Sequence, residues 1–396
     1  MKKILTYIMV VLAAGFASCN NNKTGNQPSA SDANKNSDAT TGNNAGHKAA
    51  DNPNGNSSVK LEQVFSDPTY QLTGVAISAK GRLFTDYPLW TPAIYKYALV
   101  EVLPGNKVKP YPDETMNSWK PGESGKNKWV CVQAVYIDDQ DAMWVIDPAA
   151  PKLDKVYQQS FKLVKINMNT NKVERTYTFD GGIADEHSYL NDVRVDTKRQ
   201  FAYITNSGTG GIVVVDLKSG KARQVLQNHY SVHTDKDFKF IIDGKELKQD
   251  GQPVKFDSDG IALSPDGDWL YYKPLTDTKL YRIKTEFLRN DTLPGQKLKG
   301  YVEDLGKYAV TDGMEFDKKG NLYLGDVQNS SIVKISPNLK MTTVVKDARL
   351  IWPDSYSVSK DGYLYVSCSQ IQKTPEHNAG VNKRTTPYAI YRLKLP

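Results

Sequence analysis

Two short sequence patterns each occur six times along the chain. The first starts with a polar residue, continues as an alternating strand, turns at a position that usually contains Gly, and ends in a second strand rich in Leu and Tyr. Its copies begin at Thr73, Gln133, Asn191, Asp259, Asp312 and Asp354. Subtracting neighbouring positions gives spacings of 60, 58, 68, 53 and 42 residues. Self-similarity at such a period indicates a repeat architecture.

The second pattern is a further strand within each repeat. Its copies start at Ala93, Lys162, Gly211, Lys279, Ser331 and Ala389. An isolated antiparallel sheet of such strands leaves apolar surface in water, whereas six sheets arranged radially bury it against their neighbours. The sequence therefore predicts an all-β fold, a six-bladed β-propeller of four-stranded antiparallel blades. Residues 59–65 (VKLEQVF) are expected to close the ring by pairing with the C-terminal blade.

The N-terminal residues have the features of a targeting signal. Lys2 and Lys3 precede an apolar run, residues 4–16, which is followed by two small residues and Cys19. This order is typical of a signal peptide, and a Cys directly after small residues resembles a bacterial lipobox. We therefore predict a signal peptide with lipobox over residues 1–19, a disordered polar tether over 20–58 and the propeller over 59–396. The protein is expected to be exported and anchored to a bacterial membrane by a lipid on Cys19, on the periplasmic or cell-surface face. An ordinary secretory peptide is the alternative.

Charge and cysteine content narrow the choice of partners. The formal net charge is +7 over 396 residues, and Lys is spread along the chain, so we expect no nucleic-acid partner. Cys131 and Cys368 are the cysteines that follow Cys19. We predict two separate buried thiols and a monomeric protein. The chain contains no Cys-x-x-Cys zinc motif.

The predicted topology brings the six repeat starts to one mouth of the central channel. Functional residues are expected there, because the long loops between second and third strands and the long loops between blades lie on the same face as this mouth. These loops are residues 86–92, 103–128, 147–160, 228–257 and 370–387. Thr73, Gln133, Asn191, Asp354, Tyr87, Trp90 and Tyr230 are predicted to bind a small ligand. Trp119 and Tyr157 are further rim aromatics, and each of these aromatics has the alternative role of packing its loop.

The acidic repeat starts predict electrostatic strain at this mouth. Two carboxylates about 8 Å apart repel each other by roughly 2 kcal/mol at an effective dielectric constant near 20. A bound cation, a cationic ligand or a raised pKa would relieve this repulsion. Asn191, Asp259 and Asp312 are candidate ligands for Ca²⁺ or another divalent metal, and Asp259 and Asp312 are candidate catalytic residues. Alternatively, these Asp residues only form turns.

The segments SYLNDVRVD, AYITNSGTGGIVVVDL, TDGMEFDKKGNLYLGD and IWPDSYSVSKDGYLYVS resemble the major royal jelly protein and yellow family, in a bacterial version. The resemblance implies a secreted six-bladed propeller. The family's activities include binding of biogenic amines in the propeller mouth and dopachrome conversion. A more distant similarity is to gluconolactonase-type propellers, which hold a divalent metal at their strand starts. Thr73 stands where those enzymes carry a Glu ligand.

Two hypotheses of different classes follow. In the first, the protein captures a small aromatic or amine-bearing molecule at the acidic mouth. In the second, it is an enzyme, either a metal-dependent lactonase-like hydrolase or a dopachrome tautomerase-like isomerase that uses the same mouth. A surface scaffold for protein or glycan is a third hypothesis.

Overall fold

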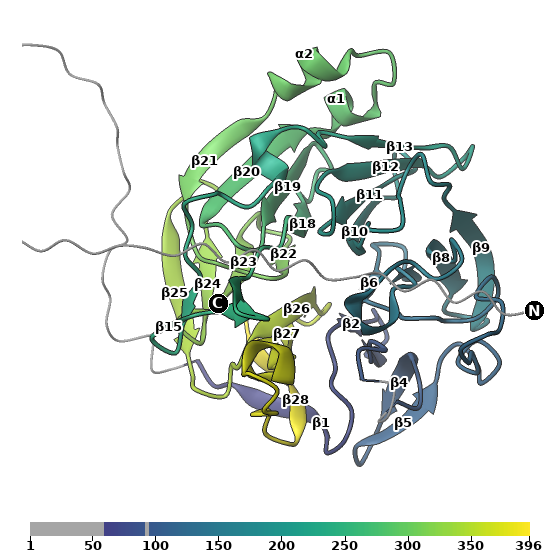
Figure 1. The fold of residues 1–396 in the computed structure, drawn as a ribbon, viewed down its shortest axis with the longest axis vertical. Helices are drawn as coiled ribbons and strands as arrows, with labels where there is room; N and C mark the ends of the chain where they lie inside the picture. Colours follow the sequence, from purple (N-terminus) through teal and green to yellow (C-terminus); the bar gives the residue numbers. More distant parts are fainter. Residues whose placement is uncertain (1–58, 92–94) are drawn as a thin grey trace, which may run out of the picture. The chain divides into compact units, whose positions relative to one another are not determined.

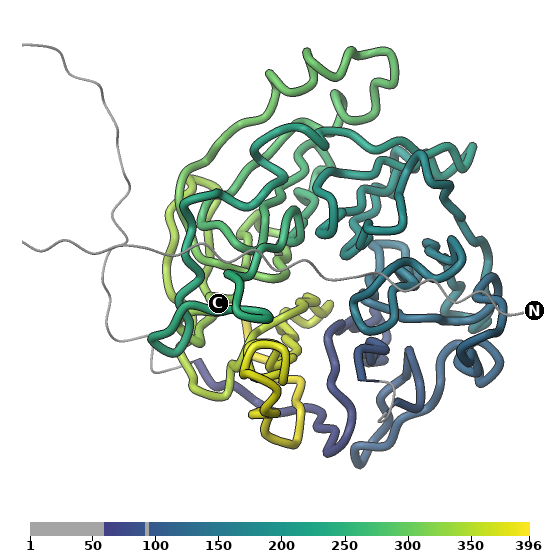
Figure 2. The backbone as a smooth tube through the Cα atoms, viewed as in Figure 1, coloured from purple at the N-terminus to yellow at the C-terminus, as the bar shows by residue number. Residues whose placement is uncertain are grey.

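The fold is known from a computed structural model that describes residues 59–91 and 95–396. Cys19, the predicted signal peptide and the predicted tether lie outside the described residues. Six four-stranded antiparallel sheets follow one another around a central channel (Figures 1 and 2). The predicted six-bladed all-β propeller is confirmed.

In each of the first five blades, the strands follow one another in chain order from the channel outward. The strands of the first three blades are β2 (Val75–Ile77), β3 (Leu83–Asp86), β4 (Leu99–Leu103), β5 (Lys107–Pro110); β6 (Ala134–Ile137), β7 (Ala142–Asp147), β8 (Lys162–Asn167), β9 (Lys172–Thr178); and β10 (Leu190–Asp196), β11 (Phe201–Asn206), β12 (Ile212–Asp216), β13 (Ala222–Val225). Those of the next two are β18 (Ser258–Leu263), β19 (Trp269–Pro274), β20 (Lys279–Lys284), β21 (Glu303–Lys307); and β22 (Met314–Phe316), β23 (Leu322–Asp326), β24 (Ser331–Ile335), β25 (Met341–Lys346).

The sixth blade contains both ends of the described chain. Its strands are β26 (Pro353–Val358), β27 (Tyr363–Cys368), β28 (Tyr388–Lys394) and, at the outer edge, β1 (Glu62–Asp67). The antiparallel pairing of β1 with β28 runs from Glu62 opposite Arg392 to Asp67 opposite Tyr388, and it closes the ring (Figure 1). This agrees with the closing strand predicted near residues 59–65.

Packing between blades follows from the period-two pattern of the strands. Ile146 and Leu163 of the second blade pack against Val193 and Ile204 of the third, and all four side chains are buried. Because alternate residues of a strand point to opposite faces, each blade can bury apolar side chains against both of its neighbours. Cys131 and Cys368 are buried free thiols, as predicted.

One strand assignment from the sequence is wrong. The third strand of the first blade was expected to start at Ala93, but β4 begins at Leu99 and pairs with β3, with Leu99 opposite Asp86. Asn117 Oδ1 accepts the backbone N–H groups of Ala98 and Leu99 at 2.9 and 3.0 Å. Apolar and aromatic residues run from Tyr95 to Val102, interrupted only by Lys96 and Glu101, so the pattern alone does not mark where pairing begins.

Two insertions add structure outside the blades. Between the third and fourth blades lie η3 (Tyr230–Val232) and two hairpins, formed by β14 (Ile241–Ile242), β15 (Lys245–Glu246), β16 (Lys248–Gln249) and β17 (Gln252–Pro253). The fourth blade carries α1 (Thr285–Arg289) and α2 (Gly295–Lys299), and the short helices η2 (Pro151–Leu153), η4 (Ile371–Lys373) and η5 (Pro375–His377) lie in loops. In the described part of the chain, no helix is both long enough and apolar enough to span a bilayer.

Candidate functional site

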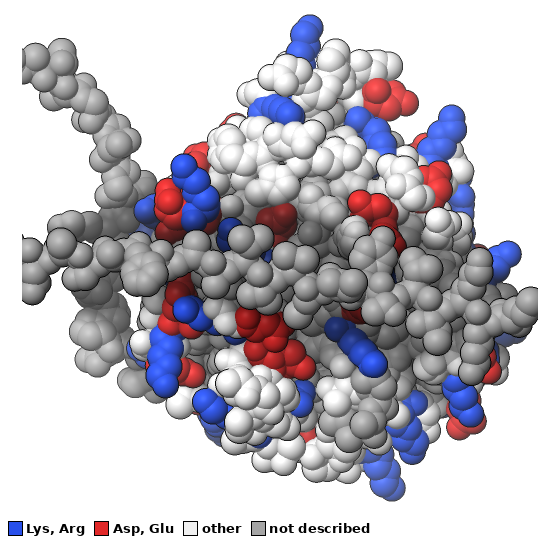
Figure 3. Space-filling view, in the orientation of Figure 1, with Lys and Arg blue, Asp and Glu red and all other residues white. Residues whose placement is uncertain are grey.

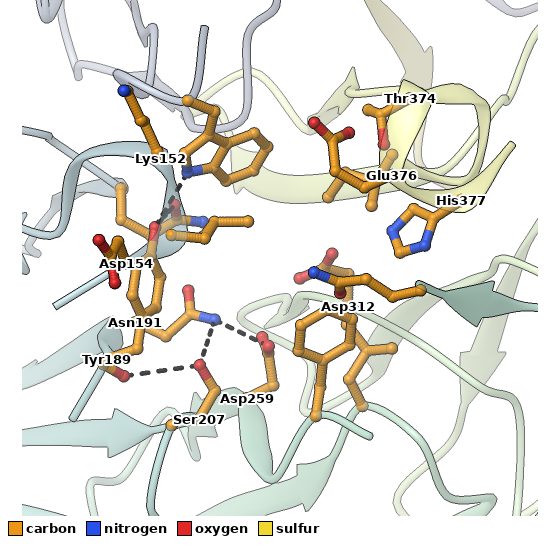
Figure 4. Close-up of a pocket in the computed structure, with 18 of the residues that line it drawn as sticks. Lys152, Asp154, Tyr189, Asn191, Ser207, Asp259, Asp312, Thr374, Glu376 and His377 are labelled. Atoms are coloured by element: carbon orange, nitrogen blue, oxygen red, sulfur yellow. Dashed lines mark hydrogen bonds between the residues drawn. The ribbon is translucent and has the colours of Figure 1, made fainter. Parts of the chain in front are cut away.

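A cavity of about 310 Å³ lies at the channel mouth where the inner strands begin. Its floor is formed by Gln133, Asn191, Asp259 and Asp312, and its walls by four of the five predicted long loops and by the connections between blades. No residue of the fifth predicted loop, 103–128, lines the cavity. Figure 4 shows Asn191, Asp259 and Asp312 together at one level of the cavity. On the face seen in Figure 3, acidic side chains occur near the centre and Lys and Arg mostly toward the edge. The structure thus brings together four of the six repeat starts.

Asp259 and Asp312 form a buried acid pair. Their exposed fractions are 4% and 8%. Burial raises the pKa of Asp259 well above its usual range, and the neighbouring Asp312 raises it further. Burial also raises the pKa of Asp312, to about 6, although hydrogen bonds from Trp352 and Asp259 oppose the rise. The two carboxyl groups therefore titrate as one coupled pair, in which the pKa of Asp259 is raised more strongly than that of Asp312.

Three neighbours orient the acid pair. Asn191 Nδ2 donates to Asp259 Oδ2 at 2.7 Å and to Ser207 Oγ at 3.2 Å (Figure 4). Trp352 Nε1 donates to Asp312 Oδ2 at 2.6 Å. Each carboxyl therefore has one oxygen held by a neighbour, which fixes its direction in the floor of the cavity.

A second chain of hydrogen bonds supports an aromatic wall. Trp90 Nε1 donates to the Tyr189 hydroxyl at 3.3 Å, and that hydroxyl donates to Gln133 Oε1 at 2.5 Å. Trp90, Tyr189 and Gln133 all line the cavity. An indole held in this way is a preorganised surface on which a ligand ring can stack.

The other two repeat starts are buried and do not line the cavity. Thr73 is fully buried, and its Oγ1 donates to Asp86 Oδ2 at 2.7 Å. Asp354 is 3% exposed and, like Thr73, does not line the cavity. Further along the channel, the buried Arg194 binds Asp192 of its own strand β10 at 2.9 Å and the carbonyl of Met314 of β22 at 2.8 Å, so its side chain crosses between the third and fifth blades.

Two predicted ligand-binding aromatics lie away from the cavity. Tyr87 is 2% exposed, packs in the core where the sixth blade meets the first, and donates its hydroxyl to Asp67 Oδ2 at 2.8 Å. Tyr230 is 57% exposed and contacts His229 and Tyr281 at the fourth blade. Trp119 and Tyr157 pack against each other instead of lining the cavity. Among the rim aromatics named from the sequence, the structure places only Trp90 in the cavity wall.

Several lining residues were not predicted. Tyr189 and Trp352 each stand two residues before a repeat start, in SYLND and IWPD, although Trp352 has a positive φ of 55° and lies just before β26. That spacing was the available signal. The charged rim residues Lys152, Asp154, Glu376 and Arg384, together with His187 and His377, come from separate loops and share no motif.

The metal predicted at Asn191, Asp259 and Asp312 does not fit these side chains. Asn191 directs its amide nitrogen at Asp259, and Trp352 occupies an oxygen of Asp312. Among the described residues, no group of three His, Cys, Asp or Glu side chains is arranged to hold a metal ion.

Comparisons with known proteins agree with this architecture. Among solved structures, luciferin-regenerating enzyme superposes with a TM-score of 0.53 at 12% identity, covering 85% of this chain and 96% of that one. A gluconolactonase of Xanthomonas campestris superposes with a TM-score of 0.51 at 10% identity, covering 86% and 90%. At these identities the similarity shows the fold alone.

Sequence relatives identify the family. Major royal jelly protein 7 of Apis mellifera is 23% identical over 238 residues, 58% of this chain and 51% of the relative. Major royal jelly protein 2 of the same species is 24% identical over 244 residues, 58% and 50%. The chain thus spans about half the length of these curated relatives. The family model described as major royal jelly protein matches residues 130–395, more than half of the chain. The resemblance read from the sequence is confirmed, and the chain belongs to the major royal jelly protein family.

Proposed function

We propose that the protein captures a small molecule carrying both an aromatic ring and an amine in the cavity above Asp259 and Asp312. The observation that carries this proposal is the buried acid pair at the floor of a cavity with an aromatic wall. The buried Lys273 acts on Asp312 through its charge, but its Nζ donates to the backbone carbonyls of Pro274 and Asp277. An ammonium group beside Asp312 would therefore be its direct ion-pair partner, and charge-assisted hydrogen bonds of this kind contribute about 1.5–3 kcal/mol.

The walls suit the rest of such a ligand. Trp90 offers an indole face held by Tyr189, and Phe256 and Leu275 also line the cavity. The volume of about 310 Å³ lies at the small end of the range for small-molecule sites. A single aromatic amine therefore matches the cavity better than a large conjugate.

The test is isothermal titration calorimetry with three matched ligands at pH 7.5. Tryptamine carries the ammonium, tryptophol replaces it with a hydroxyl, and 3-indolepropionate replaces it with a carboxylate. We expect tryptamine to bind at least tenfold more tightly than tryptophol, and the acid to bind most weakly. Asp312→Asn should remove the preference for tryptamine. Asp326→Asn, which changes a partly buried Asp outside the cavity, should keep it. Equal affinities for tryptamine and tryptophol would contradict the proposal.

The same acid pair favours one enzymatic alternative. A carboxylate with a pKa of about 6 beside a protonated carboxyl group can accept and return a proton near neutral pH. A proton-transfer isomerase of the dopachrome tautomerase type would use Asp312 as base and Asp259 as acid. Turnover of dopachrome by the wild-type protein, lost in Asp312→Asn, would support this alternative over simple capture.

Lactone hydrolysis remains a weaker candidate. The structural match to a gluconolactonase supplies the fold, but the side chains predicted as metal ligands are held by other hydrogen bonds. We also propose that the protein is exported and held to a membrane by a lipid on Cys19, on the strength of the N-terminal pattern.

A further inference from the structure

One histidine on the rim of the ligand cavity connects two loops that lie far apart in the sequence. His377 ends η5, in the loop between β27 and β28, and it lines the cavity. Its Nδ1 lies 3.0 Å from the backbone carbonyl oxygen of Lys248 in β16, which belongs to the insertion between the third and fourth blades. A loop of the sixth blade and this insertion therefore meet at His377.

The contact with Lys248 determines which ring nitrogen of His377 carries a hydrogen. A carbonyl oxygen can only accept a hydrogen bond, so Nδ1 must be the donor. In a neutral imidazole, a hydrogen on Nδ1 leaves a free lone pair on Nε2. The Lys248 carbonyl thus makes Nε2 of His377 a hydrogen-bond acceptor.

His377 is mostly neutral at pH 7.5. Burial lowers its pKa from the ordinary value of 6.5, although the Lys248 carbonyl and the charges of Glu376 and Asp250 act in the opposite direction. Because pH 7.5 lies above even the ordinary value, the imidazole is largely unprotonated there. Nε2 therefore keeps its lone pair near neutral pH.

This lone pair is free to bind a ligand. Among the described residues, Nδ1 of His377 has a hydrogen-bond partner and Nε2 has none. Figure 4 shows the ring of His377 extending from η5 into the cavity, with one ring nitrogen facing the interior. A few placed polar groups in the wall of a cavity are what orients a small ligand there.

The segment around η5 holds the ring in this position. Pro375 begins η5, and the side-chain amide of Asn378 donates to the carbonyls of Gln372 and Thr374 at 2.9 and 2.8 Å. Because Nδ1 of His377 is bound as well, little conformational freedom remains to be lost when a ligand binds. A preorganised acceptor of this kind gains affinity for that reason.

We propose that His377 is a specificity-determining residue of the ligand cavity, and that its Nε2 accepts a hydrogen bond from an N–H or O–H group on the ring of the ligand. This inference rests on the proposed function, in which the ammonium group of the ligand lies at Asp312. The floor of the cavity then binds the cationic end, and the rim binds the ring donor. The preferred ligands narrow from aromatic amines in general to those whose ring carries its own hydrogen-bond donor.

Two measurements on the full chain test this role at pH 7.5. Long-range proton–nitrogen NMR of the histidine side chains reports the tautomer without any ligand, and the signals of His377 should show hydrogen on Nδ1 only. Calorimetry then compares tryptamine with its benzothiophene analogue, in which sulfur replaces the ring N–H and the ammonium group is kept. We expect the wild-type protein to bind tryptamine about fivefold more tightly, as one net hydrogen bond provides.

Variants of His377 separate the acceptor from the connection between the loops. In His377→Asn, the amide nitrogen is as many bonds from the backbone as Nδ1, so it can still donate to Lys248, but the acceptor at Nε2 is lost. This variant should bind both amines equally. In His377→Gln, the amide group reaches as far as Nε2, and its oxygen should restore a preference for tryptamine. His229→Asn changes a histidine that does not line the cavity and should keep the wild-type preference.

Two outcomes would overturn the role of His377. One is an NMR spectrum with hydrogen on Nε2 of His377. The other is equal binding of the two amines by the wild-type protein, or an undiminished preference for tryptamine in His377→Asn. The proposed function fails by a different comparison, that of tryptamine with tryptophol, which changes the ammonium group and keeps the ring N–H.

Discussion

Replacing Asp312 with Asn should make the protein more stable at alkaline pH while abolishing its selectivity for an amine. In the native state, burial raises the pKa of Asp312 from 3.8 to about 6. A pKa shift of one unit corresponds to 1.36 kcal/mol. The rise from 3.8 to about 6 therefore means that ionised Asp312 destabilises the fold by about 3 kcal/mol relative to an uncharged side chain. Asn keeps an oxygen for the Trp352 N–H and carries no charge.

The direction of the pH dependence follows from proton binding. Between about pH 4 and 6 the native state holds the Asp312 proton more tightly than the unfolded chain does, so this group lowers the free energy of unfolding as pH rises. The stability that protonation provides is complete below the unfolded pKa and is lost as pH rises through the folded pKa. At pH 8 the Asn variant should therefore exceed the wild type by up to about 3 kcal/mol, and at pH 4 the two should be similar.

Urea denaturation at pH 4, 6 and 8 measures this difference. Asp266→Asn is a control of opposite sign, because hydrogen bonds from Ser264 and backbone N–H groups overcome partial burial and lower the pKa of that surface Asp. Its variant should lose stability at pH 8. If Asp312→Asn is less stable than the wild type at pH 8, then a positive group compensates Asp312 in the native state and the reasoning for amine capture fails.

Two further predictions concern other parts of the chain. Lys162→Ala should lower the free energy of unfolding in denaturant by about 3–5 kcal/mol, because it leaves Asp147 buried without its cation. The control Lys165→Ala, at the partly exposed pair with Glu174, should lower it by less than about 1 kcal/mol. Equal losses would mean that the Asp147 carboxylate is stabilised by its backbone donors alone. Cys19→Ser should release the expressed protein from membranes into the soluble fraction, and continued membrane association of this variant would argue against a lipid on that residue.

Repetition made the architecture predictable from the sequence. Each repeat start lies within two residues of the first residue of an inner strand, and the outermost strand of the sixth blade comes from residues before the first repeat, as the apolar pattern of residues 59–65 indicates. Strand boundaries were less well predicted, as β4 shows, because apolar and aromatic side chains continue before the first paired residue. Repeats reveal which strands exist, while hydrogen bonding decides where each one starts.

The site was only partly predictable for a related reason. Equivalent positions in six repeats must lie around one channel, which brought Gln133, Asn191, Asp259 and Asp312 together as expected. Thr73 and Asp354 occupy equivalent positions in their repeats but do not line the cavity. Thr73 instead donates its hydroxyl hydrogen bond to Asp86. Tyr87 and Tyr230 were chosen because they lie in long loops, and the sequence of a loop does not specify which side chains point inward.

The sequence by itself determined the six blades, the closing strand and a ring of polar residues around the channel, because periodic patterns encode local pairing and symmetry. Only the tertiary structure decided which acids form a coupled buried pair, which aromatic forms the cavity wall and which buried oxygens remain without partners. These properties depend on distances between residues that lie far apart in the chain, such as the 2.6 Å from Trp352 Nε1 to Asp312 Oδ2. Burial and neighbouring charge, which set the chemistry of a carboxyl group, exist only after the blades have packed around the channel.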